Sequence, residues 1–130
     1  MITDALGNPL AFRVTAGQRH EITQAEPLLR HSTLSPEQRA EVAAVLGDKG
    51  FDSDAFVAEI LSLEAKAVIP SRKGRKEPRA YDEELYKERN KVERFFGRIK
   101  HYRRVATRYE KAVRNYESFL HVACIMTWLL

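Results

Sequence analysis

Apolar and polar positions change their spacing several times along the 130 residues, and three segments have the pattern of strands. Residues 10–15 (LAFRVT) alternate apolar and polar side chains, which is the period of a half-buried strand. Residues 42–46 (VAAVL) form a short, purely apolar run that predicts a buried strand. A third strand is predicted at residues 67–69, because Pro70 directly follows them and proline ends a strand.

Two shorter helices are predicted between these strands. The first covers residues 22–30. The second covers about residues 54–63, where apolar side chains recur at helical spacing and either Asp52 or Ser53 can serve as the N-cap. Strands that alternate with helices indicate an α/β fold, and the length of the chain fits a single domain spanning residues 1–130.

The second half of the chain predicts two longer helices. Residues 82–102 predict one amphipathic helix, because they are rich in helix formers and carry apolar side chains at i, i+3, i+4 and i+7, namely Val92, Phe95, Phe96 and Ile99. The last helix is predicted at residues 112–130, where apolar residues surround the helix increasingly toward its end.

Charge is distributed unevenly along the chain, and this distribution predicts a binding partner. Residues 72–114 hold 16 Lys and Arg against 7 Asp and Glu, whereas residues 1–71 hold 6 against 10. A concentrated basic segment is typical of a surface that binds phosphates, which predicts nucleic acid as the partner. The alternative is a solvated charged face, the commoner role of a charge run. The basic loop before the long helix contributes Arg72, Lys73, Arg75 and Lys76 as candidate DNA-binding residues.

Composition limits the remaining classes. The chain is 44% hydrophobic and 31% charged, as in highly charged globular proteins. Its one cysteine, Cys124, has no partner for an internal disulfide, so we expect a buried small hydrophobe in a reducing cytoplasm. No segment resembles a signal peptide, and the apolar residues 119–130 fall short of the ~20 that a membrane-spanning helix needs, so no membrane partner is expected.

The long predicted helix carries four residues of a chemically distinctive kind. At about 100° per residue, Tyr86, Arg89, Glu93 and Lys100 lie on one stripe at the border between the apolar face and solvent. An extended phosphate backbone could contact the residues flanking this carboxylate along the helix. The alternative is an ordinary Arg89–Glu93 pair worth only ~0.2 to 0.5 kcal/mol. Gly97, on the same stripe, favours close approach of another molecule to the backbone.

The spacing Tyr86-x2-Arg89-x3-Glu93-x6-Lys100, in the context YKERNKVERFFGRIKHYRRVATRYEK, resembles the Y-R-E-K pattern of DDE-type insertion-sequence transposases. This resemblance implies an RNase H-like mixed sheet flanked by helices. It also implies that Glu93 is the last carboxylate of the DDE triad and that the matching tyrosine, arginine and lysine belong to the surface that binds transposon-end DNA.

A second match lies upstream, where the segment GDKGFDSD at residues 47–54 resembles the part of the family that holds the second catalytic aspartate. Asp48 is the matching residue, and it follows a predicted strand, where ligands bind in α/β sheets. A loop carboxylate is the alternative. Asp52 and Asp54 are interpreted as helix-cap and first-turn acids. Asp48 and Glu93 are therefore the expected ligands of Mg²⁺ or Mn²⁺ in two-metal DNA cleavage and strand transfer.

The chain departs from the family pattern at its beginning. In the family the first aspartate of the triad lies on the first, central strand, and no segment of this chain matches that strand. We therefore expect a fold that is incomplete at the N-terminus and a triad that lacks its first member. Asp4, in the segment DALGNP, is interpreted as a turn residue rather than a replacement ligand.

Three functions remain open from the sequence. The chain could be the C-terminal part of a transposase, inactive alone and completed by an upstream transposase product. It could instead be a decayed, non-catalytic DNA-binding module. A third hypothesis is an oligomerising remnant, for example a homodimer, that uses the apolar end of the last helix at Trp128, Leu129 and Leu130.

Overall fold

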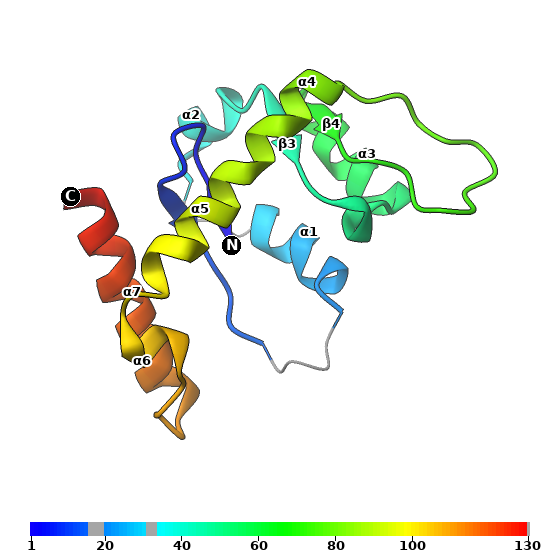
Figure 1. Cartoon of the computed structure of the whole chain (residues 1–130). Coiled ribbons are helices and arrows are strands. Elements are labelled where there is room, and N and C mark those ends of the chain that lie inside the picture. The colour runs from blue at the N-terminus through cyan, green and yellow to red at the C-terminus, as the bar shows by residue number, and fades with distance from the viewer. Residues whose placement is uncertain (16–19, 31–33, 130) are drawn as a thin grey trace. The chain divides into compact units, whose positions relative to one another are not determined.

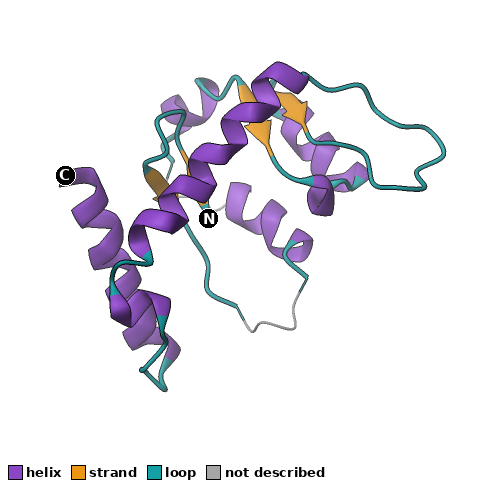
Figure 2. Ribbon diagram, in the orientation of Figure 1, coloured by secondary structure: helices purple, strands orange, loops and turns teal. Residues whose placement is uncertain are grey.

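The computed structural model describes residues 1–15, 20–30 and 34–129, which form two compact units. The terminal unit combines residues 1–15 with residues 90–129, and the central unit consists of the described part of residues 16–89. Helices predominate, and the strands form two separate two-stranded sheets (Figures 1 and 2). The described residues are therefore of mixed α/β structure, as expected, but they do not form the one mixed sheet expected of an RNase H-like fold.

The central unit is built from helices around one parallel strand pair. In chain order its elements are α1 (Ile22–Arg30), α2 (Pro36–Ala40), β3 (Ala44–Leu46), the 3-10 helix η1 (Lys49–Phe51), α3 (Asp54–Ser62), β4 (Lys66–Val68), α4 (Glu83–Tyr86) and the 3-10 helix η2 (Lys87–Arg89). Its buried apolar residues are Leu29, Phe56, Val57, Ile60, Ala65, Val68 and Ile69.

The two strands of the central unit run parallel, with Val45 opposite Ala67. A parallel pair needs a crossover, and α3 supplies it between the strands. β4 begins one residue before the predicted strand. β3 begins two residues later than predicted and is half-buried, so the expectation of a buried strand was wrong. An apolar run of this length does not distinguish a buried strand from the half-buried edge of a small sheet.

The start of α3 shows which of the two candidate caps is used. The Ser53 hydroxyl accepts a hydrogen bond from the Phe56 backbone N–H at 3.1 Å, and Asp54 lies in the first turn. Both features stabilise a helix start, because they satisfy an unpaired N–H and place a negative charge at the positive end of the dipole. Asp52 is not the cap of α3, and its side chain is buried elsewhere.

The terminal unit begins with a short antiparallel hairpin, β1 (Ile2–Thr3) paired with β2 (Pro9–Ala11). The carboxylate of Asp4 accepts hydrogen bonds from the backbone N–H groups of Leu6 and Asn8, each at 2.8 Å. Gly7 follows with φ +85°, a conformation that glycine adopts without strain. The interpretation of Asp4 as a turn residue is thus confirmed. The predicted strand at residues 10–15 is shorter than expected and begins at Pro9.

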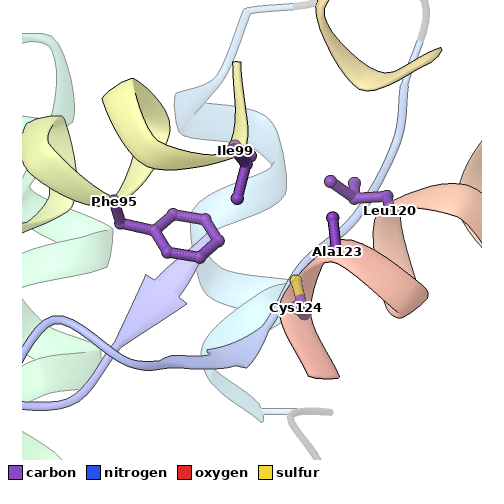
Figure 3. Packing of buried hydrophobic residues seen from close by; sticks show 5 residues of the cluster. All are labelled: Phe95, Ile99, Leu120, Ala123 and Cys124. Atoms are coloured by element: carbon purple, nitrogen blue, oxygen red, sulfur yellow. The ribbon is translucent and has the colours of Figure 1, made fainter. Parts of the chain in front are cut away.

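Three helices complete the terminal unit: α5 (Asn90–Ile99), α6 (Arg103–Ala106) and α7 (Val113–Leu129). One face of α5 packs against one face of α7, as Figure 3 shows for the buried residues Phe95, Ile99, Leu120, Ala123 and Cys124. This packing explains why apolar side chains recur at helical spacing in both segments. Cys124 is buried, as predicted from the sequence, and burial raises the pKa of its thiol.

α7 also exposes several large apolar side chains, including Val122, Ile125, Trp128 and Leu129. The Trp128 indole N–H donates to the Pro9 carbonyl at 2.9 Å and so ties the end of α7 to the hairpin. Leu130, which the oligomerisation hypothesis also used, lies outside the described residues. Within the described ranges no helix is long and apolar enough to cross a membrane.

Candidate functional site

Asp48 lies two residues beyond the end of β3, at the start of η1. Its Oδ1 accepts a hydrogen bond from the Gly50 backbone N–H at 2.7 Å, which makes Asp48 the cap of η1. The side chain is half-buried. A Cβ on Gly50 would lie 2.8 Å from this oxygen, so the position of the carboxylate depends on glycine at residue 50.

The basic loop and Asp48 leave the same edge of the parallel strand pair. The Gly47 backbone N–H donates to the Val68 carbonyl at 3.3 Å, so pairing extends to the last residue before Asp48. The chain beyond β4 then enters the basic loop, residues 71–79, which Figure 1 shows as a long excursion between β4 and α4. Because the strands are parallel, their carboxyl ends share one edge, which is where α/β sheets bind ligands.

Asp52 organises this loop from inside the protein. Its side chain is 1% exposed, and its two oxygens accept hydrogen bonds from the Arg72 backbone N–H at 2.7 Å, from Arg75 Nε at 2.8 Å and from the Arg79 guanidinium. The Arg72 Nε also donates to the Asp52 carbonyl at 2.9 Å. Burial raises the pKa of Asp52, but the hydrogen bonds from Arg75, Arg72 and Arg79 outweigh it and hold the pKa below its ordinary value.

Asp54 extends the same network at the surface. Its Oδ1 lies 3.1 Å from Arg75 Nη1 and also contacts Arg79. Two arginines of the loop are therefore neutralised by two aspartates of the segment around the start of α3, whereas Lys73 and Lys76 are exposed. Sequence reasoning did not find the role of Asp52 or Arg79. The available signal was the spacing of arginines at positions 72, 75 and 79 after a strand.

Tyr86 and Arg89 form a pair at the end of the central unit. The Arg89 guanidinium carbon lies 5.6 Å from the centroid of the Tyr86 ring, within the range of a cation–π contact. The two residues belong to α4 and to η2, so the segment predicted as one long helix from residue 82 to residue 102 is not a regular α-helix.

Glu93 and Lys100 belong to the terminal unit and are both exposed. The Lys100 backbone N–H donates to the Phe96 carbonyl at 3.1 Å, so Lys100 continues the helical turn and lies about 20° from Glu93 around the axis. A constant 100° per residue does not hold through η2, because a 3-10 helix turns ~120° per residue. The uniform helix on which one stripe of four residues was predicted is therefore interrupted: Tyr86 and Arg89 belong to the central unit, and Glu93 and Lys100 to the terminal unit. Glu93 is more exposed than the predicted border position.

Gly97 was expected to mark a close approach to the helix backbone. Apart from the adjoining residues and backbone of its own helix, no atom of the described residues lies within 4 Å of a Cβ built on Gly97, so packing within the chain does not require glycine there. By contrast, Gly7 is in close contact with α5, since its Cβ would lie 3.3 Å from the Lys91 carbonyl. Two cations of the α5 segment hold this turn, because Lys91 Nζ donates to the Ala5 carbonyl and Arg98 to the Gly7 carbonyl.

The chemistry of the two candidate carboxylates fits a hard divalent cation. Oxygen ligands are those that Mg²⁺ and Mn²⁺ prefer. Asp48 Oδ1 accepts the Gly50 N–H, whereas its Oδ2 makes no hydrogen bond with a described residue. Asp48 is part of the central unit and Glu93 part of the terminal unit. In the described part of the chain, no group of three or more His, Cys, Asp and Glu residues could by itself hold a metal ion.

Comparison with known proteins adds sequence relationships to this geometry. Residues 1–128 match the family model of the transposase DDE domain. A protein of Brucella ovis, named as a transposase for insertion sequence element IS6501, is 39% identical over 129 residues, which cover 98% of this chain and 94% of the relative. A Burkholderia cepacia protein, named as a transposase for element IS402, is 30% identical over 132 residues, covering 97% of this chain and 59% of that relative. No solved structure gave a significant match.

Proposed function

The chain belongs to the family of DDE-type insertion-sequence transposases, and on this premise we propose that it binds the ends of its element and contributes two carboxylates to their cleavage. Family membership assigns it to DNA transposition in general. The observation that carries the finer proposal is the shared edge of the β3–β4 pair. There Asp48 and the basic loop leave neighbouring parallel strands, so a metal ligand and phosphate-binding cations are available together.

Asp48 and Glu93 are the carboxylates that would hold Mg²⁺ or Mn²⁺. A pair of such ions supplies an activated water or 3′-hydroxyl and stabilises the leaving oxygen during in-line displacement at a phosphate. The part of the protein is to place the oxygens. For Asp48 this is done by the Gly50 N–H, which fixes the carboxylate at the start of η1. In this proposal, the carboxylate that completes the triad comes from outside residues 1–130, on an upstream transposase product.

Binding of end DNA is assigned first to the exposed lysines of the basic loop. Lys73 and Lys76 are exposed on the basic loop, whereas Arg75 is engaged by Asp52 and Asp54. We assign Arg75 and Arg72 a second role, to hold the loop in shape. Arg89, stacked on Tyr86, and Lys100 supply further phosphate contacts, because arginine on an aromatic ring keeps its planar fork for a phosphate.

The proposal is tested by separating binding from cleavage with Asp48→Asn. The unaltered chain alone is expected to bind duplexes that carry the element's ends, with an affinity that falls steeply with salt. With the upstream coding region fused in frame, the unaltered protein should cleave these duplexes in Mg²⁺. Asp48→Asn should lower single-turnover cleavage by at least about a thousandfold, to a residual rate that can still be measured, because it removes a hard oxygen ligand. The dissociation constant for the ends should be nearly unchanged. Cleavage by Asp48→Asn at close to the unaltered rate would refute the catalytic assignment.

Gly50→Ala is expected to inactivate the same fused protein without unfolding it. The new methyl group would lie 2.8 Å from Asp48 Oδ1, and the end of that side chain can move away at little cost to the fold. A displacement of about 1 Å can lower a rate by roughly a hundredfold, which is the expected loss of end cleavage. Thermal unfolding checks the fold. In an Asp48→Asn background, Gly50→Ala should cause no further loss, and a further loss would show that it acts by another route.

A further inference from the structure

We propose a second DNA-binding site on the terminal unit, in which Arg103, Arg104 and Arg108 bind phosphates of the duplex backbone irrespective of sequence. The choice of DNA as the ligand rests on the proposed function. The site itself rests on contacts around α6 and the start of α7, and neither candidate catalytic carboxylate takes part in it.

The segment around α6 is densely basic. Residues 103–114 contain five Lys and Arg and a single acid, Glu110. All five cations are exposed, whereas the Glu110 side chain is 8% exposed. A solvated charged face is the common explanation of such a run, so the arrangement of individual arginines has to decide between that and a binding site.

Arg104 is held on two sides. Its Nη1 donates to Oε1 of the buried Glu110 at 2.7 Å, and its guanidinium carbon lies 4.8 Å from the centroid of the Phe119 ring on α7. No other side-chain hydrogen bond of Arg104 to a described residue is found, so the remaining N–H donors of the fork can serve a ligand. An arginine that is already ordered loses less side-chain entropy when it binds a phosphate.

Arg108 is ordered by equivalent contacts. Its guanidinium carbon lies 5.5 Å from the centroid of the Tyr116 ring, and its Nε donates to the Glu110 carbonyl at 3.3 Å. Tyr116 is itself fixed, because its hydroxyl donates to the Val105 carbonyl at 3.1 Å. Two arginines thus converge on Glu110, and each is stacked on an aromatic ring of α7. A merely solvated arginine has no such support.

An open hollow beside these arginines is lined by Arg103, Arg104 and Tyr109. The Tyr109 side chain is 56% exposed and brings a hydroxyl and a ring to the rim. The surface of this hollow is mostly apolar, so the hollow itself is not the phosphate site. The phosphate contacts are assigned to the exposed guanidinium groups around it, because planar forks donate two parallel hydrogen bonds to a phosphate. This composition offers no pattern for reading base edges, so the site is expected to add affinity without sequence preference.

The test measures binding of the chain to a short mixed-sequence duplex without element ends, by fluorescence anisotropy over a range of salt concentrations. The double variant Arg104→Gln/Arg108→Gln is expected to lower the slope of log affinity against log salt by about two and to weaken binding at least about tenfold. Arg103→Gln should lower the slope by about one. Arg103 makes no side-chain hydrogen bond or ion pair with a described residue, so this variant keeps the Glu110 contacts intact.

Two further variants serve as controls. Arg13→Gln/Lys66→Gln removes the same charge from exposed positions elsewhere and should change the slope far less. Arg104→Lys/Arg108→Lys keeps the charge and should keep the slope, yet weaken binding because lysine lacks the planar fork.

The proposal is overturned if Arg103→Gln leaves the slope unchanged, or if the Arg104/Arg108 double variant has the slope of the charge-matched control. Its outcome is separable from that of the proposed function, which depends on Asp48 and Glu93. If substitution of both carboxylates leaves cleavage by the fused protein unchanged, the catalytic assignment is refuted. The salt dependence of duplex binding would still show whether the second DNA-binding site exists.

Discussion

Glu93→Gln is expected to lower cleavage of the element's ends by at least about a thousandfold in the protein fused to its upstream segment, because it removes a hard oxygen ligand. Binding of the same ends should be equal or slightly tighter, since the substitution removes a negative charge beside the cations of α5. Single-turnover cleavage in Mg²⁺ and equilibrium binding measure the two effects. Opposite changes in binding and cleavage distinguish a catalytic carboxylate from one that supports the fold.

Glu83, ten residues earlier in the chain, provides a matched control. Glu83→Gln changes an exposed acid at the start of α4 in the same way, and it should leave cleavage within about twofold of the unaltered rate, the range expected of a surface substitution. Glu93 would lose its assignment if its variant cleaved as well as Glu83→Gln does.

Combining Glu93→Gln with Asp48→Asn sharpens this test. Residues that act as one catalytic unit are strongly non-additive, so the double variant should be no slower than the slower single variant. Two losses that multiply would instead indicate that the carboxylates act independently, contrary to a shared metal site.

The helices could be predicted from the sequence most completely. α1 has the predicted bounds, and α7 follows the predicted segment because its apolar residues pack against α5. The position of the α3 start was likewise predicted, although the sequence left Asp52 and Ser53 open as its cap and the structure uses Ser53. These features depend on spacing and on contacts within a few residues, which a sequence displays directly.

The interruption of the long helix could not be predicted in this way. Residues 86–89 (YKER) are ordinary helix formers, and nothing in their composition distinguishes an α-helix from the 3-10 turn that the structure has there. The break lies at the division between the two compact units, which falls after Arg89. The prediction that Tyr86, Arg89, Glu93 and Lys100 share one stripe assumed a uniform α-helix, which the structure does not have at these residues.

The burial of Asp52 is a second feature that could not be predicted from the sequence. Its partners lie 20 to 27 residues away in the chain, and a sequence does not show which of many arginines an aspartate will contact. The sequence interpretation as a helix-cap acid was reasonable for its position, yet the cap is Ser53, and the Asp52 side chain is fully buried among cations. Part of the basic charge that predicted DNA binding is consequently used to hold the loop.

Asp52→Ala is therefore expected to lower the free energy of unfolding by about 3 kcal/mol, because breaking a buried ion pair leaves its partners without compensation. Arg75 and Arg79 would lose the carboxylate that joins the loop to the start of α3, and the Arg72 N–H would lose its acceptor. Urea unfolding monitored by circular dichroism measures the change. Proteolysis within residues 71–79 should accelerate, since the loop would keep its contacts with Asp54 and with the backbone carbonyl of residue 52 but lose those with the buried carboxylate.

The pH dependence of the free energy of unfolding shows how much of the stabilisation by Asp52 comes from its negative charge rather than from its size and shape. The pKa of Asp52 is lowered in the folded protein, so the stabilisation by its ionised form is present above the unfolded value of about 3.9 and is lost as the pH falls toward the folded pKa. Asp52→Asn cannot ionise, so the difference in stability from the unaltered chain should be largest near neutral pH and shrink in acid. Asp54→Asn is the matched control, because Asp54 contacts the same two arginines with a side chain that is 84% exposed, and it should change stability little at any pH. Equal losses in Asp52→Asn and Asp54→Asn would contradict a buried hub, because solvent would then be screening both carboxylates alike.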